Sequence, residues 1–414
     1  MRFLFGCLTA TVLFAGCMGS VDDSLLGDDS SAEPGKPQGP GGGRRDGGTS
    51  GTSGTSGTSG TSGASGTSGT SGTSGTGSSG TLSSSGAGGS TSSGGASGCG
   101  VACGANARCT SAGDACVCLP GFSDSNGACV AATPGTPESH TEAQVCARWN
   151  EGHDTTAAGS GWTAGGEQCS PGTLSREAIN DAIARINMFR WFHGLAPVVD
   201  DEANFDKAMA CSTVGSFNPP GTVPNPHSPP TTAKCYSQLG AAGAGSSNMA
   251  WGSGSAAQAM DQWVQDNGND TTLGHRRWIL NPPMGKTAVG YFAGGGPYGN
   301  ASCMTSFDQS GNGPAPDLIT FPPAGFAPLS MVRWIWSVHM TGANPSANGS
   351  TLTVTRRGDG ANLQFQRLPL NSGYGYPAVG FRPSGWQPQV GDTYDVTFTV
   401  GNTTRSWSVT VAGC

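Results

Sequence analysis

Two histidines and one aspartate are the side chains of this sequence best placed to do chemistry. His227 lies in a loop stiffened by prolines, Pro-Asn-Pro-His-Ser-Pro-Pro, and His275 lies in the run Gly-His-Arg-Arg. Asp266 follows Trp263 by three residues, at the edge of a helical stripe, so it could face a cleft. Two imidazoles and a carboxylate suit zinc and would leave a fourth position open for water. We therefore expect a cleft in which His227 and His275 are metal ligands and all three residues are candidates for catalysis.

The same three residues also have a structural interpretation. His275 would anchor packing near Trp278, which is three residues further along. Asp266 would be a helix N-terminal residue, or would form a turn with Asn267 and Gly268. In that case the polar side chains would serve the fold and no ligand.

Four neighbouring or similar residues are expected to have structural roles. Arg276 and Arg277 could hold an anion, although pairing with Asp or Glu on the same surface is the favoured interpretation. His193 closes a helix next to Gly194, where the helix C-terminus favours positive charge, so it is interpreted as a stabilising cap. His153 has acidic neighbours and is expected to be solvated.

The spacing of apolar residues predicts the elements that must position these side chains. A helical period predicts helices over 179–189, 205–212 and 256–264. After about Leu318 the period changes to two, and short polar turns separate the runs. This pattern predicts an antiparallel β-sandwich, immunoglobulin-like or fibronectin-like in size, with strands near 352–354, 394–400 and 407–411.

Taken in order, the motifs of residues 175–283 resemble the CAP superfamily of cysteine-rich secretory proteins, antigen 5 and plant pathogenesis-related proteins. The resemblance implies an α+β fold, an α-β-α sandwich whose cleft is lined by two histidines and two acidic residues. His227 and His275 match the cleft histidines, and Asp266 matches one of the acids.

The resemblance departs from the family at the second acid. The family has Gly-Glu-Asn where this chain has Ser246, Ser247 and Asn248, so Ser247 stands in the place of the glutamate. Losing that carboxylate weakens any mechanism that needs all four groups. The ligand-binding cleft is accordingly assigned to His227, Ser247, Asn248, Asp266 and His275.

The start of the chain predicts export and anchoring. Residues 1–17 combine a positive start with a short apolar run and end in Ala-Gly-Cys, which is typical of a signal peptide with a lipobox that lipidates Cys17. Phe14 stands where a lipobox usually has leucine, so plain secretion is the alternative. Residues 18–98 contain a Thr-Ser-Gly repeat with little apolar surface to bury, so they predict a disordered linker. Of 14 cysteines, Cys7 and Cys17 belong to this leader, and the even remainder predicts disulfides in an exported protein.

Six cysteines crowd into residues 99–130, and the run Cys-Val-Cys-Leu-Pro-Gly-Phe resembles an epidermal-growth-factor-like module. So small a unit buries too little apolar surface to fold without disulfides. The resemblance implies the pairs Cys99–Cys109, Cys103–Cys116 and Cys118–Cys129. Residues 131–145 are expected to be a linker.

The predicted fold class is therefore multidomain: an EGF-like module, a CAP domain over 146–305, and an all-β sandwich over 306–414. Six cysteines remain in the last two parts, and six cysteines allow fifteen connectivities. Proximity in the sequence, a weak guide, suggests Cys146–Cys169, Cys211–Cys235 and Cys303–Cys414.

Three functional hypotheses follow. The first is a lipid-anchored cell-surface protein that binds an envelope or extracellular ligand, such as a lipid, without catalysis. The second is a metal- or histidine-dependent hydrolase of peptide or cell-wall material. The third is a structural envelope or adhesion protein with a vestigial cleft. The sequence specifies no cofactor with certainty, and zinc is the candidate that the donor set would accept.

Other functional classes are disfavoured. The net charge of −7 with 11% charged residues provides no basic patch, so nucleic acid is not expected as a partner. The sequence contains no His-Glu-x-x-His motif, which excludes that helix-borne metalloprotease site, and no Gly-x-Ser-x-Gly, which argues against an α/β-hydrolase.

Overall fold

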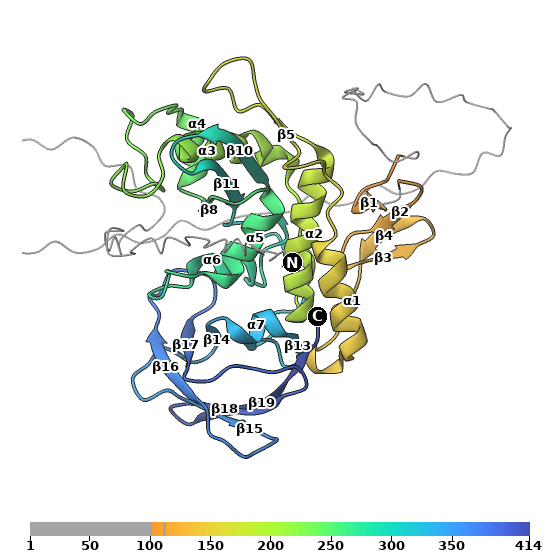
Figure 1. Cartoon of the computed structure of the whole chain (residues 1–414), viewed down its shortest axis with the longest axis vertical. Helices are drawn as coiled ribbons and strands as arrows, with labels where there is room; N and C mark the ends of the chain where they lie inside the picture. The colour runs from red at the N-terminus through yellow and green to blue at the C-terminus, as the bar shows by residue number, and fades with distance from the viewer. Residues whose placement is uncertain (1–101, 111–112) are drawn as a thin grey trace, which may run out of the picture. The chain divides into compact units, whose positions relative to one another are not determined.

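A computed structural model describes residues 102–110 and 113–414, which belong to one compact unit of mixed helix and sheet (Figure 1). The predicted signal peptide and lipobox of residues 1–17, the lipidation site Cys17, the linker 18–98 and Cys99 lie outside the described residues.

The small N-terminal module consists of two hairpin-like pairs of strands. β1 (Ala107–Cys109) pairs with β2 (Cys116–Cys118), and β3 (Phe122–Ser125) pairs with β4 (Ala128–Ala131). Its predicted disulfides Cys103–Cys116 and Cys118–Cys129 are present. Cys109 is also disulfide-bonded, and its predicted partner Cys99 lies outside the described residues.

The module is attached to the helices that follow it. Arg108 is buried and donates to the backbone carbonyl of Glu151, at 2.7 Å. Leu119 and Phe122 are buried in the same apolar core as the helices. The first helix, α1 (Glu142–His153), begins inside the stretch predicted as a linker, where Thr141 and Gln144 form a reciprocal capping box.

The middle of the chain forms a three-layer arrangement around an antiparallel sheet of order β10-β11-β8. Helices α3 and α4 pack on one face, and α5 packs on the other with α2 behind it (Figure 1). Alternate residues of each strand face opposite layers, as the pleat requires. The bounds are α2 (Arg176–Phe192), α3 (Phe205–Phe217), α4 (Gln238–Ala244), β8 (Ser247–Trp251), α5 (Ala256–Gln265), α6 (Gly274–Ile279), β10 (Val289–Gly295) and β11 (Gly299–Thr305).

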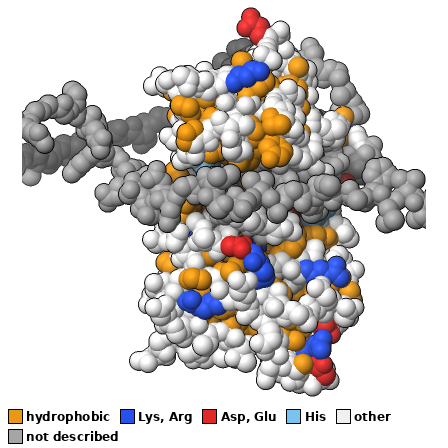
Figure 2. All heavy atoms as spheres, turned by 60° about the vertical axis from the view of Figure 1, so that its left-hand side comes forward, with side chains coloured by type: hydrophobic (Ala, Val, Ile, Leu, Met, Phe, Trp, Pro, Cys, Tyr) orange, Lys and Arg blue, Asp and Glu red, His pale blue; other side chains and the backbone are white. Residues whose placement is uncertain are grey.

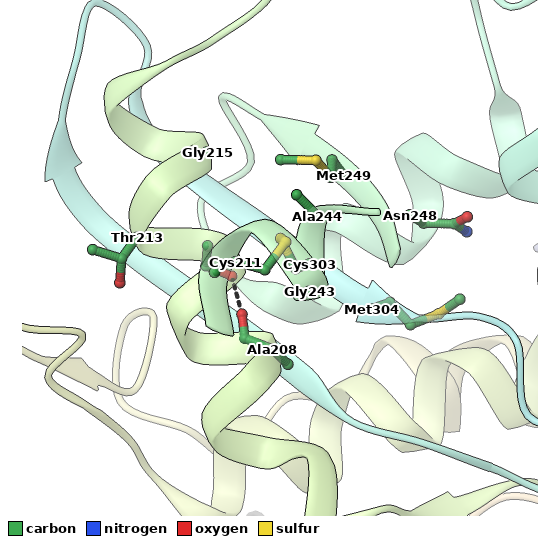
Figure 3. Close-up of a disulfide and its surroundings, with 12 residues drawn as sticks. Ala208, Cys211, Thr213, Gly215, Gly243, Ala244, Asn248, Met249, Cys303 and Met304 are labelled. Carbon is green, nitrogen blue, oxygen red and sulfur yellow. Dashed lines mark hydrogen bonds between the residues drawn. A yellow bond between two sulfur atoms is a disulfide. The ribbon is translucent and has the colours of Figure 1, made fainter. Parts of the chain in front are cut away.

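A disulfide ties one helical layer to this sheet. Cys211 on α3 is bonded to Cys303 on β11, and Ala244 and Met249 complete a small buried cluster around the bond (Figure 3). The adjacent residue Met304 belongs to the large core on the other face. The predicted helices over 179–189, 205–212 and 256–264 are therefore confirmed as α2, α3 and α5, which pack in two layers around the sheet.

Short elements connect these layers. They are the 3-10 turns η2 (Pro137–Ser139) and η3 (Glu202–Asn204), the antiparallel pair β5 (Trp162–Thr163) with β6 (Thr173–Leu174), and the parallel pair β7 (Val199–Asp200) with β9 (Lys286–Thr287).

The C-terminal part contains two four-stranded sheets that share one apolar core. The first has the order β12-β14-β17-β16 and the second β13-β19-β18-β15. The predicted alternation is confirmed: β18 buries Tyr394, Val396, Phe398 and Val400. The bounds are β12 (Leu318–Phe321), β13 (Gly325–Pro328), α7 (Leu329–Arg333), β14 (Trp336–Met340), β15 (Thr351–Arg356), β16 (Gln364–Pro369), β17 (Ala378–Ser384), β18 (Thr393–Val400) and β19 (Thr403–Ala412).

One strand pair differs from the predicted antiparallel arrangement. β13 runs parallel to β19, with Gly325 opposite Val409. The two strands are far apart in sequence, so no hairpin fixes their relative direction.

The large core also crosses the boundary expected at residue 306. Ile319, Phe321, Met331 and Ala412 are buried together with apolar residues of α2 and α5. The C-terminal sheets are therefore packed against the helices.

Three predicted disulfides are wrong. The structure has Cys146–Cys414, Cys169–Cys235 and Cys211–Cys303 in place of Cys146–Cys169, Cys211–Cys235 and Cys303–Cys414. The packing of α1 explains the bond between Cys146 and Cys414, which are 268 residues apart in the sequence. Helix α1 lies beside β13 and β19, and Gly413 donates to the Glu142 side chain at 3.3 Å. Each of the three bonds joins two segments that lie together only in the tertiary fold. The residues next to each cysteine in the sequence do not reveal which cysteine is its partner.

The surface carries few charges. On the face shown in Figure 2, the Lys and Arg side chains of the described residues are scattered and do not gather into a single patch.

Candidate functional site

Asp266 and His275 form a hydrogen-bonded pair at the ends of two helices. The Asp266 Oδ1 atom accepts a hydrogen bond from His275 Nδ1 at 2.8 Å. Asp266 caps the C-terminus of α5 in the left-handed conformation, with φ 55°. Its carboxylate also accepts from the backbone N–H of Arg276 at 3.2 Å and from Asn269 at 3.2 Å. The Asp266 side chain is 1% exposed and that of His275 is 27% exposed, so a buried acid orients an accessible imidazole.

His227 is held by a similar hydrogen bond, in this case to the end of helix α4. Its Nδ1 contacts the backbone carbonyl of Ala244, at the end of α4, at 2.8 Å. Asn225 accepts from the His227 backbone N–H at 2.8 Å and so fixes the proline-rich loop. The residue is exposed to solvent.

The two histidines influence one another electrostatically. Although His227 is exposed, the surrounding protein lowers its pKa by desolvation, and repulsion from nearby His275 lowers it further. The hydrogen bond to Ala244 acts in the opposite direction but does not offset these effects. His227 is therefore neutral at pH 7, the form in which imidazole binds metals.

Ser247 and Asn248, the other two residues of the predicted cleft, lie on β8. The Asn248 side chain donates to the His275 carbonyl at 3.1 Å and accepts from Ser306 at 3.2 Å, so it attaches α6 to the sheet. Ser247 is 6% exposed and its Oγ has no hydrogen-bond partner among the described residues. By strand alternation, Ser247 faces the layer that contains α4, which His227 caps.

Asp266 is not a free carboxylate beside the two histidines, as the sequence suggested. Its carboxylate is committed to His275, Arg276 and Asn269. Within residues 102–110 and 113–414, no three His, Cys, Asp or Glu side chains lie close enough together to share a metal ion. The arrangement therefore offers two imidazoles as donors, with the acid in an orienting role.

Arg276 and Arg277 neither pair with surface acids nor point to solvent. Arg276 is 0% exposed, donates to the backbone carbonyls of Val264, Gln265 and Ile335, and lies 4.0 Å from the centre of the Phe321 ring. Arg277 donates to the carbonyls of Thr272, Asn371 and Tyr376. Burial lowers the pKa of Arg276 to about 9 and that of Arg277 to about 10. Both arginines join the helices to the C-terminal sheets, so the expectation of surface ion pairs is wrong.

His193 does end α2, as expected, but as a neutral group. Its Nδ1 contacts the Phe189 carbonyl at 2.6 Å, and its ring stacks on Phe321 at 5.5 Å. Burial lowers its pKa to about 4, and nearby Arg276 and Arg190 contribute to that shift. The burial that the sequence did not reveal outweighs the attraction of a helix C-terminus for positive charge.

The expectation that His153 is solvated is wrong. His153 is partly buried against Trp149, and its Nε2 lies 3.6 Å from Oδ1 of Asp261. The four-residue spacing of Trp149 and His153 on a helix would have predicted their stacking. No local pattern links either residue to Asp261, more than a hundred positions away.

Comparison with protein-family models, curated proteins and solved structures found no match to this chain. The resemblance to the CAP superfamily thus remains a prediction that depends on the motifs themselves. None of the helices within residues 102–110 and 113–414 combines the length and the apolar character of a membrane span.

Proposed function

We propose that this protein is a binding module of the cell exterior in which His227 and His275 jointly hold a divalent metal ion of the zinc type. One observation carries the proposal. Each histidine directs Nδ1 to an oxygen acceptor, Ala244 O or Asp266 Oδ1, both at 2.8 Å. Metal-binding histidines are oriented in this way, because the hydrogen bond fixes the tautomer and leaves Nε2 free for the metal.

Charge and burial support the same assignment. The lowered pKa of His227 keeps its imidazole neutral near pH 7, so a metal would not have to displace a proton there. The Asp266 carboxylate supplies negative charge behind His275 and makes that imidazole a better donor.

Two protein ligands leave coordination positions for water and for a ligand that brings its own donor atom. In the CAP pattern a glutamate would occupy the place of Ser247 and could fill one of them. The hydroxyl of Ser247 gives a more open site, which favours binding of an exogenous anionic or carbonyl-bearing ligand over a closed structural metal site.

The five disulfides of the described residues indicate an extracellular or secreted protein. Lipidation of Cys17 would add a membrane anchor and make the envelope the location of the ligand. Mass spectrometry of the N-terminal peptide tests the anchor, since Cys17→Ser should abolish the acyl mass and release the protein from membranes.

Zinc calorimetry on the full chain tests the site. The double variant His227→Ala/His275→Ala should lose one bound equivalent. Ser228→Ala, which alters an exposed neighbour of His227 with no side-chain partner among the described residues, should bind like the wild type. Unchanged binding in the double variant would contradict the proposal and leave His227 as a cap of α4.

A second function is favoured by the Asp266–His275 pair. A carboxylate bound to Nδ1 is the arrangement that lets an imidazole act as a general base toward water at Nε2. Hydrolysis of peptide or cell-wall material would then stop in His275→Gln while structure is retained. If the protein releases no product from such substrates, or if the variant releases as much, the hydrolase hypothesis fails.

The third hypothesis, a structural envelope protein with a vestigial cleft, makes the opposite prediction. Both histidines would then tolerate replacement without effect on metal binding or on the host cell, whereas loss of the cysteines would remove the folded protein.

A further inference from the structure

An aromatic pair lies beside His275 on the surface of α6. Four of the six residues of this helix are buried, and His275 and Trp278 are the two that reach the surface. Because they are three residues apart, their side chains lie on the same face of the helix. The Trp278 ring contacts that of Phe307, just beyond the end of β11, with 4.8 Å between the ring centres. The exposed face of α6 thus combines one imidazole with two aromatic rings.

Phe307 is exposed although the residues on either side of it are anchored. Its side chain is 54% exposed. On one side, the Ser306 hydroxyl donates to the Asn248 side chain at 3.2 Å. On the other side, the Asp308 carboxylate accepts from the backbone N–H of Gly285 at 2.8 Å. A ring held out between anchored neighbours is preorganised to contact a ligand, because little conformational freedom is lost when the ligand binds.

The C-terminal sheets contribute a third ring. Tyr374 lies in the loop between β16 and β17, next to α6. A side chain at Gly274 would collide with the Tyr374 ring, because its Cβ would lie 2.7 Å from Cδ1. Arg277 donates to the carbonyls of Asn371 and Tyr376, so it fixes both ends of this loop on α6 (Figure 1). Tyr374 therefore borders the exposed face of the helix in a fixed position.

The charges around this aromatic rim, which consists of Trp278, Phe307 and Tyr374, argue against an ionic ligand. The Asp266 side chain is only 1% exposed, so its negative charge does not reach the surface. The guanidinium of Arg277 lies 5.5 Å from the centre of the Tyr374 ring. That ring already has a cation against it, and a second cation would be repelled. A neutral ligand fits these surroundings better than a charged one.

Two polar atoms beside the rim can orient a neutral ligand. Trp278 is only partly buried, and its Nε1 donates to no residue of the described part of the chain. His275 Nδ1 is bonded to Asp266, which leaves Nε2 as an acceptor. Aromatic faces attract the weakly positive edges of C–H groups. A sugar ring presents C–H groups on its faces and hydroxyls at its edge, so it satisfies both requirements. An acyl chain would leave both nitrogen atoms without partners.

We propose that the aromatic rim binds a neutral glycan of the N-acetylhexosamine class. A face of one sugar ring would pack on Phe307, its acetamido oxygen would accept from Trp278 Nε1, and a hydroxyl would donate to His275 Nε2. Tyr374 would contact the next sugar unit. This inference deepens the proposed function, because it names the chemical class of the extracellular ligand and rests on the same surface. It shares only His275 with the metal site and needs no bound metal.

Calorimetry of the full chain with an N-acetylglucosamine trisaccharide, in the presence of a chelator, tests the rim. The wild type should bind, and Phe307→Ser should weaken binding about tenfold through the loss of one aromatic contact. Tyr298→Ser is the matched control, because Tyr298 is 45% exposed and lies at the opposite end of β11, so this variant should bind like the wild type. Trp278→Phe keeps a ring and removes the N–H donor, so it should also weaken binding. Thermal melting checks that each variant is folded.

Zinc calorimetry on the same proteins separates this inference from the metal site. Phe307→Ser should bind zinc like the wild type. A wild-type chain that binds no trisaccharide, or trisaccharide binding that Phe307→Ser and Trp278→Phe both leave unchanged, would overturn the glycan proposal whatever the zinc result. Binding to phosphatidylcholine vesicles in place of the trisaccharide would assign the rim to lipid and also overturn it. Trisaccharide binding that Phe307→Ser weakens, in a chain that binds no zinc, would support the rim and contradict the metal site.

Discussion

The helix–sheet part of the molecule and the C-terminal sheets bury different kinds of side chain. Around α2, α5 and α6, the buried set includes Arg190, Asp266 and Arg276, each with several hydrogen bonds. The core between the two C-terminal sheets consists of apolar residues such as Val354 and Phe398. A buried polar group is costly unless it is hydrogen-bonded, so the first region depends on specific polar contacts and the second mainly on apolar packing.

The largest effect is expected from breaking a buried polar contact between the two regions. Arg276→Met should lower the free energy of unfolding by about 3–5 kcal/mol, because it leaves buried carbonyls of both regions without donors. Guanidinium denaturation measures the change. Arg405→Met, at an exposed ion pair with Asp317, should cost less than about 1 kcal/mol. If the two variants lose the same free energy of unfolding, the buried arginine contributes no more to stability than the surface arginine, and the prediction is wrong.

The covalent connection between the regions should come next. Replacing Cys146 and Cys414 by Ser removes a bond that joins α1 to the end of the second sheet, and we expect a loss of roughly 2–5 kcal/mol. Thermal melting with and without the substitutions tests this. Cys103→Ser/Cys116→Ser is the comparison, because its bond closes a loop of 13 residues and its removal should lower the melting temperature less than removal of the bond between Cys146 and Cys414.

The buried polar region should also make stability depend on pH. His193 has a pKa of about 4 when folded, below the usual 6.5, so the unfolded chain binds the proton more readily between these values. Stability is therefore full above about pH 6.5 and falls as the pH drops toward 4, by about 3 kcal/mol for this group. His193→Phe should reduce the drop when unfolding is followed at pH 7 and pH 4.5. His339 would account for part of the slope that remains, because burial holds its pKa well below the usual value.

The smallest effect concerns the candidate site itself. Asp266→Asn keeps a residue that tolerates the left-handed backbone but removes the charge behind His275, so zinc affinity at this site should fall about 10- to 100-fold. Calorimetry measures the change, with Asp317→Asn as a surface control. A variant that binds zinc as tightly as the wild type would show that the carboxylate serves only to cap α5.

Local patterns predicted much of the fold. The helical period around Ile183 and the two-residue period around Val396 arise from which faces are buried, and that information is present in a short window. The motif positions of His227 and His275 also singled out a pair of histidines that influence one another in the structure. The sequence indicated Asp266 only as a candidate beside the histidines, and the structure gives it a hydrogen bond to His275.

Local patterns in the sequence specify the helical and two-residue periodicities and the histidines worth testing, and the resemblance to an epidermal-growth-factor-like module implied the disulfides Cys103–Cys116 and Cys118–Cys129. The tertiary structure is needed to show that Cys146 pairs with Cys414, that Arg276 and Arg277 are buried between the helices and the sheets, and that His153 meets Asp261. The physical reason is common to all three. Burial and pairing depend on contacts between elements that are distant in the chain, and a side chain's own neighbours in sequence do not specify what will pack against it.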